Sequence, residues 1–266
     1  MTGDSCLSEV HITGPSVIES GSQPFVELTC SFHFLSSEYN QLDIKWYFDT
    51  EEEPSLQWVP SSGRQPQTIG QRFKSRVKTR HVLTNTTHGY KTDQVIRVFH
   101  PSIHTSGDYH CKVATFTEED TSSHSLMIFD PGAGPFLSYS SHNLSCSASQ
   151  VFPEPKLSLS WYSEPDYDHH MGDMTTTTVR RGLMYDVSVK TMLSSSLSHQ
   201  TVFSCSMEIP GTQFSLNKKT MYSPDTRDIA RASQVSDGNT SMLKCHALLL
   251  LLVLWEVRES AQHWIA

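Results

Sequence analysis

Apolar and polar residues alternate in short runs along most of the chain. Val26, Leu28 and Cys30 fall on one side of such a run, as do Ile44 and Trp46 in the next. A period of two places apolar side chains on one face of a β-strand. Further runs of this kind lie at 157–161 and 187–189. No segment before residue 240 has a convincing helical period, so we expect an all-β chain of short strands packed as sandwiches.

The strand pattern occurs twice, and a turn-rich stretch at 130–135 separates the two copies. We therefore expect one β-sandwich over residues 7–131 and a second over 132–223. The polar residues 224–246 predict a stalk, and the nine apolar residues 247–255 form a short hydrophobic segment. The predicted fold is thus two tandem β-sandwiches followed by a C-terminal stalk.

Charge and length exclude several classes of protein. The chain has 266 residues with 20 Lys+Arg against 28 Asp+Glu, a formal net charge of −8. It has no long basic run, so we expect no nucleic-acid partner. The single strongly apolar run is too short for a multi-span membrane protein. Residues 1–131 hold 16 of the acidic residues, which is either a solvated surface or a recognition face for a basic partner.

Six cysteines stand at positions 6, 30, 111, 146, 205 and 245. Cys30 and Cys111 are 81 residues apart, and Cys146 and Cys205 are 59 apart. One long-range pair in each half suggests one disulfide bond per domain. No CxxC or Cys/His zinc spacing occurs, so no metal site is expected from the cysteines. Two cysteines, at positions 6 and 245, have no obvious partner.

The residues between the cysteines carry a resemblance. Trp46 follows Cys30 by 16 residues, and Tyr109 precedes Cys111 by two. This Cys…Trp…Tyr-x-Cys pattern resembles the core signature of the immunoglobulin superfamily. The resemblance implies that the disulfide joins two sheets, that Trp46 packs on it, and that the Tyr109 hydroxyl bonds the chain upstream. The wide cysteine spacing leaves room for the extra strands of a variable-type domain.

The second half resembles a constant-type domain. Trp161 follows Cys146 by 15 residues, and the shorter cysteine spacing suits seven strands. One departure is Phe203, which takes the place of the corner tyrosine and can pack but cannot donate a hydrogen bond. In the first half, Thr105 stands where variable-type domains usually have Asp. An ion pair from Arg72 would then be missing unless Asp108 substitutes.

A narrower resemblance rests on the segments 42–48, 57–60 and 111–116. A variable-type domain followed by a constant-like one, with these segments, is similar to arthropod cell-surface proteins of the beaten-path type. The butyrophilin type of immune ligand has the same domain order. The first likeness implies axon guidance and neuronal recognition through contacts between variable-type domains.

The disulfides and three sequons, at Asn85, Asn143 and Asn239, indicate an oxidising, extracellular compartment with glycosylation. The N-terminus has no apolar signal segment, and we take the start as incomplete; the alternative is a cytosolic chain with reduced thiols. The apolar run 247–255 is too short to span a membrane. We interpret it as a partial membrane anchor or lipid-anchor signal, and otherwise as a short buried or free helix.

Catalysis is not expected. The cluster around His169 and His170 could bind a metal if a loop enclosed one, but an exposed polar loop is the preferred interpretation. No Gly-x-Ser-x-Gly turn, phosphate loop or dinucleotide motif occurs. We therefore expect no enzyme, no cofactor and no metal.

Binding to another protein is the better supported function. The candidate partner-binding residues are Trp58, Glu118, Glu119 and Asp120, with Tyr47, Phe48 and Phe116 as further exposed aromatics. We expect Trp58 to be exposed or half-buried, beyond an acidic turn at 49–54. The acidic turns could attract a basic partner or keep a sheet edge soluble, and Tyr47 and Phe116 could equally pack in the core. The predicted function is cell-surface recognition or adhesion, in which the first domain binds another cell-surface protein, either a second copy or a different protein. The alternative is a secreted immune or defence factor that binds a microbial or carbohydrate ligand.

Overall fold

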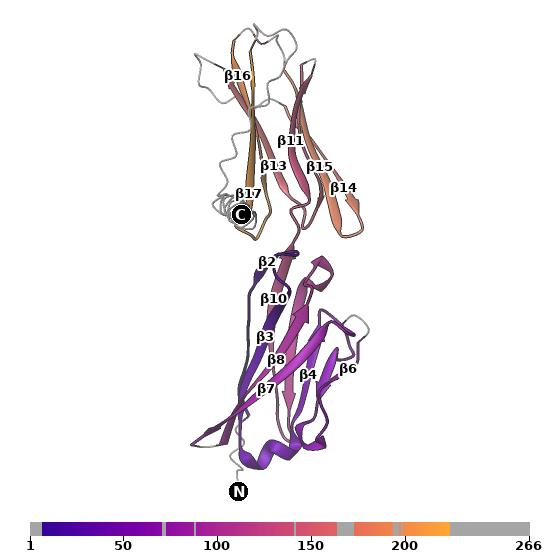
Figure 1. Cartoon of the computed structure of the whole chain (residues 1–266), viewed down its shortest axis with the longest axis vertical. Helices are drawn as coiled ribbons and strands as arrows, with labels where there is room; N and C mark the ends of the chain where they lie inside the picture. Colours follow the sequence, from indigo (N-terminus) through magenta and orange to yellow (C-terminus); the bar gives the residue numbers. More distant parts are fainter. Residues whose placement is uncertain are drawn as a thin grey trace, which may run out of the picture.

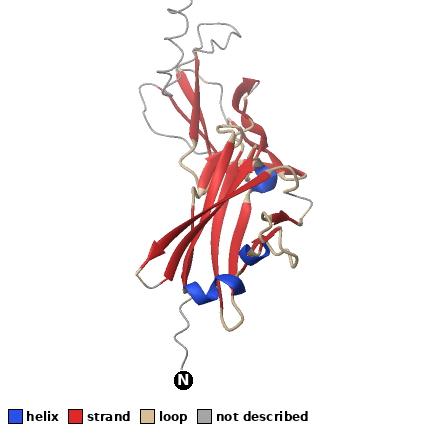
Figure 2. Ribbon diagram, turned by 60° about the horizontal axis from the view of Figure 1, so that its bottom comes forward, coloured by secondary structure: helices blue, strands red, loops and turns tan. Residues whose placement is uncertain are grey.

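The computed structural model describes residues 7–70, 73–87, 89–140, 142–163, 173–193, 197 and 199–223. Figure 1 shows two β-sandwiches arranged end to end, with the N-terminal one below. Strands dominate both sandwiches (Figure 2), and the described helical segments are three short turns of the first sandwich. These turns are η1 (Ser36–Gln41), η2 (Pro60–Ser62) and η3 (Ile103–Thr105).

Two sheets form the first sandwich. The back sheet has the order β1-β3-β8-β7, made of β1 (Ser8–Thr13), β3 (Phe25–Phe34), β8 (Gly89–Phe99) and β7 (Val77–Thr86). The front sheet has the order β2-β10-β9-β4-β5-β6, made of β2 (Val17–Glu19), β10 (Glu119–Phe129), β9 (Gly107–Ala114), β4 (Asp43–Phe48), β5 (Leu56–Trp58) and β6 (Gln67–Thr68). Two extra strands, β5 and β6, at the edge of the front sheet are typical of a variable-type immunoglobulin domain.

The second sandwich has four strands against three. One sheet has the order β11-β12-β15-β14, made of β11 (Ala133–Ser140), β12 (Asn143–Val151), β15 (Met184–Met192) and β14 (Thr175–Arg181). The other has the order β13-β16-β17, made of β13 (Lys156–Ser163), β16 (Thr201–Glu208) and β17 (Ser215–Tyr222). This is the arrangement of a constant-type domain, so the predicted fold class is confirmed.

The predicted alternation sets the core of the first sandwich. Val26, Leu28 and Cys30 of β3 are at most 2% exposed, and so are Ile44 and Trp46 of β4. Their neighbours along each strand face solvent or are half-buried. Burial of one face by each sheet is the main favourable term in forming such a sandwich.

The chain passes between the sandwiches over residues 130–132. Asp130 and Phe152 exchange two backbone hydrogen bonds, of 2.8 and 2.9 Å, across this junction. Phe129, the last residue of β10, is buried, and its ring centroid lies 5.6 Å from that of Phe214. The cluster around it comprises Ala148, Val151, Met207 and Ile209. A residue of the first sandwich therefore completes a core at the base of the second.

Several sequence predictions fall outside the described residues. They concern Cys6, Cys245, Asn239, Arg72, the His169–His170 loop, the stalk at 224–246 and the hydrophobic segment at 247–255. In the part of the chain that the structure does describe, no helix has the length and apolarity needed to cross a bilayer.

Candidate recognition surface

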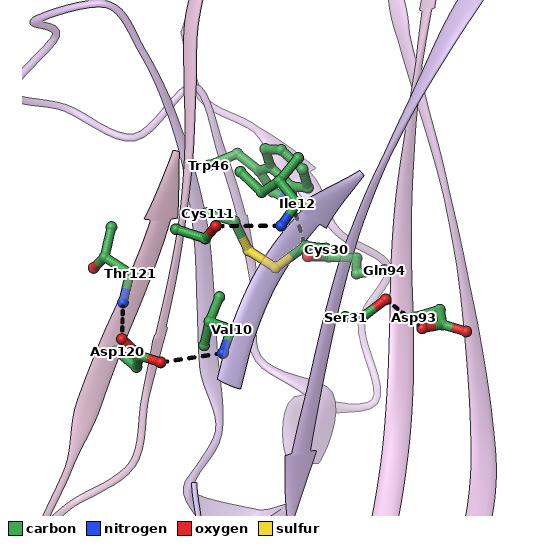
Figure 3. The surroundings of a disulfide bond; sticks show 11 residues. Val10, Ile12, Cys30, Ser31, Trp46, Asp93, Gln94, Cys111, Asp120 and Thr121 are labelled. Carbon is green, nitrogen blue, oxygen red and sulfur yellow. Dashed lines mark hydrogen bonds between the residues drawn. A yellow bond between two sulfur atoms is a disulfide. The ribbon is translucent and has the colours of Figure 1, made fainter. Parts of the chain in front are cut away.

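A disulfide bond fixes the two sheets of the first sandwich to each other. Cys30 of β3 and Cys111 of β9 are joined, with an S–S distance of 2.07 Å. Trp46 is buried in the same core, and its Nε1–H donates to the Gln94 Oε1 at 3.0 Å (Figure 3). The Tyr109 hydroxyl donates to a backbone carbonyl, that of Thr105, at 2.8 Å. These residues lie where the immunoglobulin resemblance places them.

The second sandwich has the same kind of core without the corner hydroxyl. Cys146 and Cys205 form its disulfide bond, and Trp161 is buried nearby. Phe203 is fully buried and stacks on Tyr139, with ring centroids 4.9 Å apart. Burial raises the pKa of the Tyr139 hydroxyl, and the nearby Tyr222 raises it further. The Phe203 ring thus contributes a stacking contact with Tyr139, where a corner tyrosine would contribute a hydrogen bond.

The departure at position 105 has a local structural role. The Thr105 Oγ1 accepts the Ser102 N–H at 3.1 Å and donates to the Ser102 carbonyl at 2.9 Å, so it closes the turn η3. Asp108 is exposed, and its carboxylate accepts a hydrogen bond from Ser125. The expectation that Asp108 could take the place of the missing acidic partner of Arg72 lies outside the described residues, because Arg72 does.

The outward face of the front sheet is polar and internally paired. By strand register, Gln57, Lys45, Lys112 and Thr121 form one row across β5, β4, β9 and β10. Lys45 Nζ lies 2.8 Å from the Asp43 carboxylate, and Lys112 Nζ lies 2.7 Å from Glu119.

The pKa of Lys45 reflects this pairing. A hydrogen bond to the Asp43 carboxylate raises the pKa of the Lys45 ammonium, although partial burial opposes the shift. The ammonium is therefore firmly charged at neutral pH. The ion pairs are half-exposed, so they order the surface more than they stabilise the fold.

Two of the predicted acidic residues have partners within the domain: Glu119 pairs with Lys112, and Asp120 accepts backbone hydrogen bonds. The Asp120 Oδ2 accepts the Val10 N–H at 3.1 Å, and its Oδ1 accepts the Thr121 N–H at 2.8 Å (Figure 3). Ser122 similarly accepts the Ile12 N–H at 3.2 Å. These bonds attach β1 of the back sheet to β10 of the front sheet. Asp120 is thus engaged within the domain, which weakens its predicted part in docking.

We expect Asp120→Ala to lower the free energy of unfolding of the first sandwich by about 1–2 kcal/mol. Val10 is buried, and its N–H would lose its acceptor. Chemical denaturation measures the change. The control is Glu119→Ala, which removes only a half-exposed ion pair and should cost about 0.5 kcal/mol or less. Equal losses for the two variants would contradict the assigned role of Asp120.

The expectation that Trp58 is exposed or half-buried is wrong. Trp58 is 8% exposed, and its ring lies against that of His81 of β7, tilted by 32° with centroids 4.4 Å apart. The inward positions of β5 are Leu56 and Trp58, and β7 covers the second of them. Phe48 is also fully buried, in edge-on contact with Tyr109. Neither Trp58 nor Phe48 can anchor a partner without leaving the core.

Phe116 is the most exposed of the four candidate aromatic residues. It is 84% exposed at the tip of the β9–β10 hairpin, while Tyr47 is half-buried on the front sheet. The turn beneath it is well bonded: the Thr115 N–H donates to the Glu118 carbonyl at 2.8 Å. The Thr115 Oγ1 accepts the Glu118 N–H at 3.1 Å. The position of Phe116 in a hairpin turn, outside the alternation of β9, is the sequence signal that separates it from core aromatics.

The sequons within the described residues are both exposed. Asn85 lies near the end of β7, and Asn143 begins β12. Both are therefore accessible for the predicted glycosylation. Among the described residues, no group of three or more His, Cys, Asp or Glu side chains is placed to hold a metal ion.

No protein-family model matches the sequence, and no curated protein does either. Solved structures do. The crystal structure of bovine butyrophilin superposes with a TM-score of 0.55 at 16% identity, over 78% of this chain and 96% of that one. A chain from the crystal structure of ICOS with ICOS-L and an anti-ICOS-L VNAR domain gives a TM-score of 0.54 at 16% identity, over 77% and 98%. The likeness is one of fold: this chain consists of two tandem immunoglobulin-like β-sandwiches.

Proposed function

We propose that this chain is an extracellular recognition protein that binds another cell-surface protein through the front sheet and hairpin tip of its first sandwich. The observation that carries the proposal is Phe116, which is 84% exposed on a hydrogen-bonded turn. Aromatic anchors commonly dominate interface energies. Because the turn is already ordered, little conformational entropy is lost when a partner binds it.

The charge around Phe116 indicates the chemistry of the partner. Glu118 follows it by two residues, whereas the nearby Glu119 and Asp43 are already paired with Lys112 and Lys45. An apolar pocket with a Lys or Arg placed to meet Glu118 would match this tip. Such complementarity acts chiefly on the rate of association and on specificity.

Two further observations support an extracellular role. Each sandwich contains a disulfide bond, and such bonds persist in oxidising compartments. One structure with this fold is a complex of ICOS with ICOS-L, two proteins that bind each other. The second sandwich then serves as a spacer, with the chain tethered through its C-terminal segment. The likeness to beaten-path proteins makes neuronal recognition our proposed setting.

A screen of the multimerised chain against immunoglobulin-superfamily ectodomains tests the proposal. We expect a partner whose affinity falls by about 2 kcal/mol, or about thirtyfold, when Phe116 is replaced by Ala. The matched control is Phe136→Ala, since Phe136 is 55% exposed on β11 of the second sandwich. Unchanged binding by Phe116→Ala, or an equal loss with Phe136→Ala, would refute the proposed surface.

A further inference from the structure

Basic residues stand at alternate positions where the chain enters β7. They are Lys74, Arg76, Lys78 and Arg80, which we call the basic edge, and all four are exposed. In an extended chain alternate residues share a face and lie about 6.6–6.8 Å apart. The Arg76 carbonyl already accepts the Phe99 N–H, so the extended pairing with β8 begins there. Lys78 and Arg80 therefore share one face of β7, and Lys74 and Arg76 precede them in the turn at 73–76.

β7 is the terminal strand of the back sheet. In the order β1-β3-β8-β7 it pairs, among the described strands, only with β8 (Figure 1). All ten positions of β7 are exposed or half-buried. The basic edge thus runs along a free sheet edge, on the opposite sheet from the hairpin tip that carries Phe116.

The charge of the basic edge is not neutralised by its neighbours. Lys74, Arg76 and Arg80 form no ion pair or side-chain hydrogen bond with another described residue. Lys78 lies over the ring of Phe99, 5.3 Å from its centroid. On the next two strands the acidic residues are already paired, Glu27 with Arg97 at 2.9 Å and Asp93 with Lys91 at 3.8 Å.

We propose that the basic edge binds a linear sulfated polysaccharide of the cell surface or matrix. Such a chain carries anionic groups at regular intervals and can lie along an exposed strand. Arg guanidinium groups can bind sulfate oxygens in pairs, and Lys adds point charges. An acidic surface of a second copy fits less well, because no described strand has acidic residues at alternate positions to match the basic edge. The polysaccharide and the protein partner would occupy opposite sheets.

Binding of the full chain to immobilised heparin tests the proposal. We expect retention that weakens steeply with salt, on the order of a hundredfold between about 50 and about 200 mM for four ionic contacts. The double variant Lys78→Ala/Arg80→Ala should bind about tenfold more weakly, with a shallower salt dependence. The control Lys218→Ala/Lys219→Ala removes the same charge from β17, an edge strand of the second sandwich, and should bind like wild type.

Several outcomes would overturn the proposal. One is flow-through of the wild-type chain at about 50 mM salt, and another is an equal loss in the two double variants. Binding to phosphatidylserine vesicles but not to heparin would assign the edge to a lipid surface. Self-association that the Lys78→Ala/Arg80→Ala variant abolishes, without heparin binding, would assign it to a second copy. Phe116→Ala should retain full heparin binding, so this test is independent of the protein-partner proposal.

Discussion

Replacing Trp46 by Ala should lower the free energy of unfolding of the first sandwich by about 3–5 kcal/mol, because a large buried ring would leave a cavity that the sheets cannot close. Trp46 is 2% exposed and lies in the same core as the disulfide between Cys30 and Cys111. Its indole N–H is also the donor to Gln94, whose amide is completely buried. The variant would leave the Gln94 oxygen without that hydrogen bond, which adds to the cavity cost.

Calorimetry or chemical denaturation, with a probe in each sandwich, measures this effect. Trp161→Ala is the matched control, since it removes the corresponding ring from the second sandwich, with an expected loss of the same size. We expect each substitution to act mainly on the sandwich that contains it. If Trp46→Ala left the unfolding of the first sandwich unchanged, the placement of Trp46 in that core would be wrong.

The core was predictable because it depends on local periodicity. Val26, Leu28 and Cys30 alternate in the sequence and are buried in the structure. The spacing of Trp46 and Tyr109 from the cysteines also predicts where β4 and β9 lie relative to the disulfide bond. A one-residue slip of either strand would turn this set toward solvent, so the alternation also fixes the register.

The candidate surface was less predictable, because it depends on residues far apart in the chain. Trp58 is buried in the core of the first sandwich, where its ring contacts His81 from a strand of the other sheet. Asp120 is engaged because β1, 110 residues earlier, presents an N–H to it. No local pattern contains either contact. Phe116 was a candidate from the sequence, but its exposure was decided only by its place in the turn between β9 and β10.

The basic edge does not form a contiguous basic run in the sequence, since Ser75, Val77 and Thr79 interrupt the cations. Within β7, the alternation of Lys78 and Arg80 with Val77 and Thr79 places both cations on one face of the strand. The net charge of −8 for the whole chain does not indicate the local charge at the basic edge. Screening by salt limits the influence of each charge to about 8–10 Å, so distant acidic residues do not cancel it.

The junction leads to the second large effect on stability: Gly132→Ala should lower the free energy of unfolding by about 2–4 kcal/mol. Gly132 has a φ of +55°, a conformation that costs other residues about 1–2 kcal/mol. An added Cβ would lie 2.3 Å from the Gln150 carbonyl oxygen and 2.4 Å from that of Ser149. Both are backbone atoms of β12, so relief requires a shift of the strand and adds the cost of overpacking.

Gly182→Ala separates the conformational cost of a positive φ from the cost of displacing β12. Gly182 has a φ of +66° in the turn after β14, but an added Cβ there meets no atom within 4 Å. It should therefore cost only the conformational strain, about 1 kcal/mol. Chemical denaturation of both variants gives the difference, which is the cost of displacing β12. If Gly132→Ala cost no more than Gly182→Ala, the close approach of Gly132 to the Ser149 and Gln150 carbonyls of β12 would be wrong.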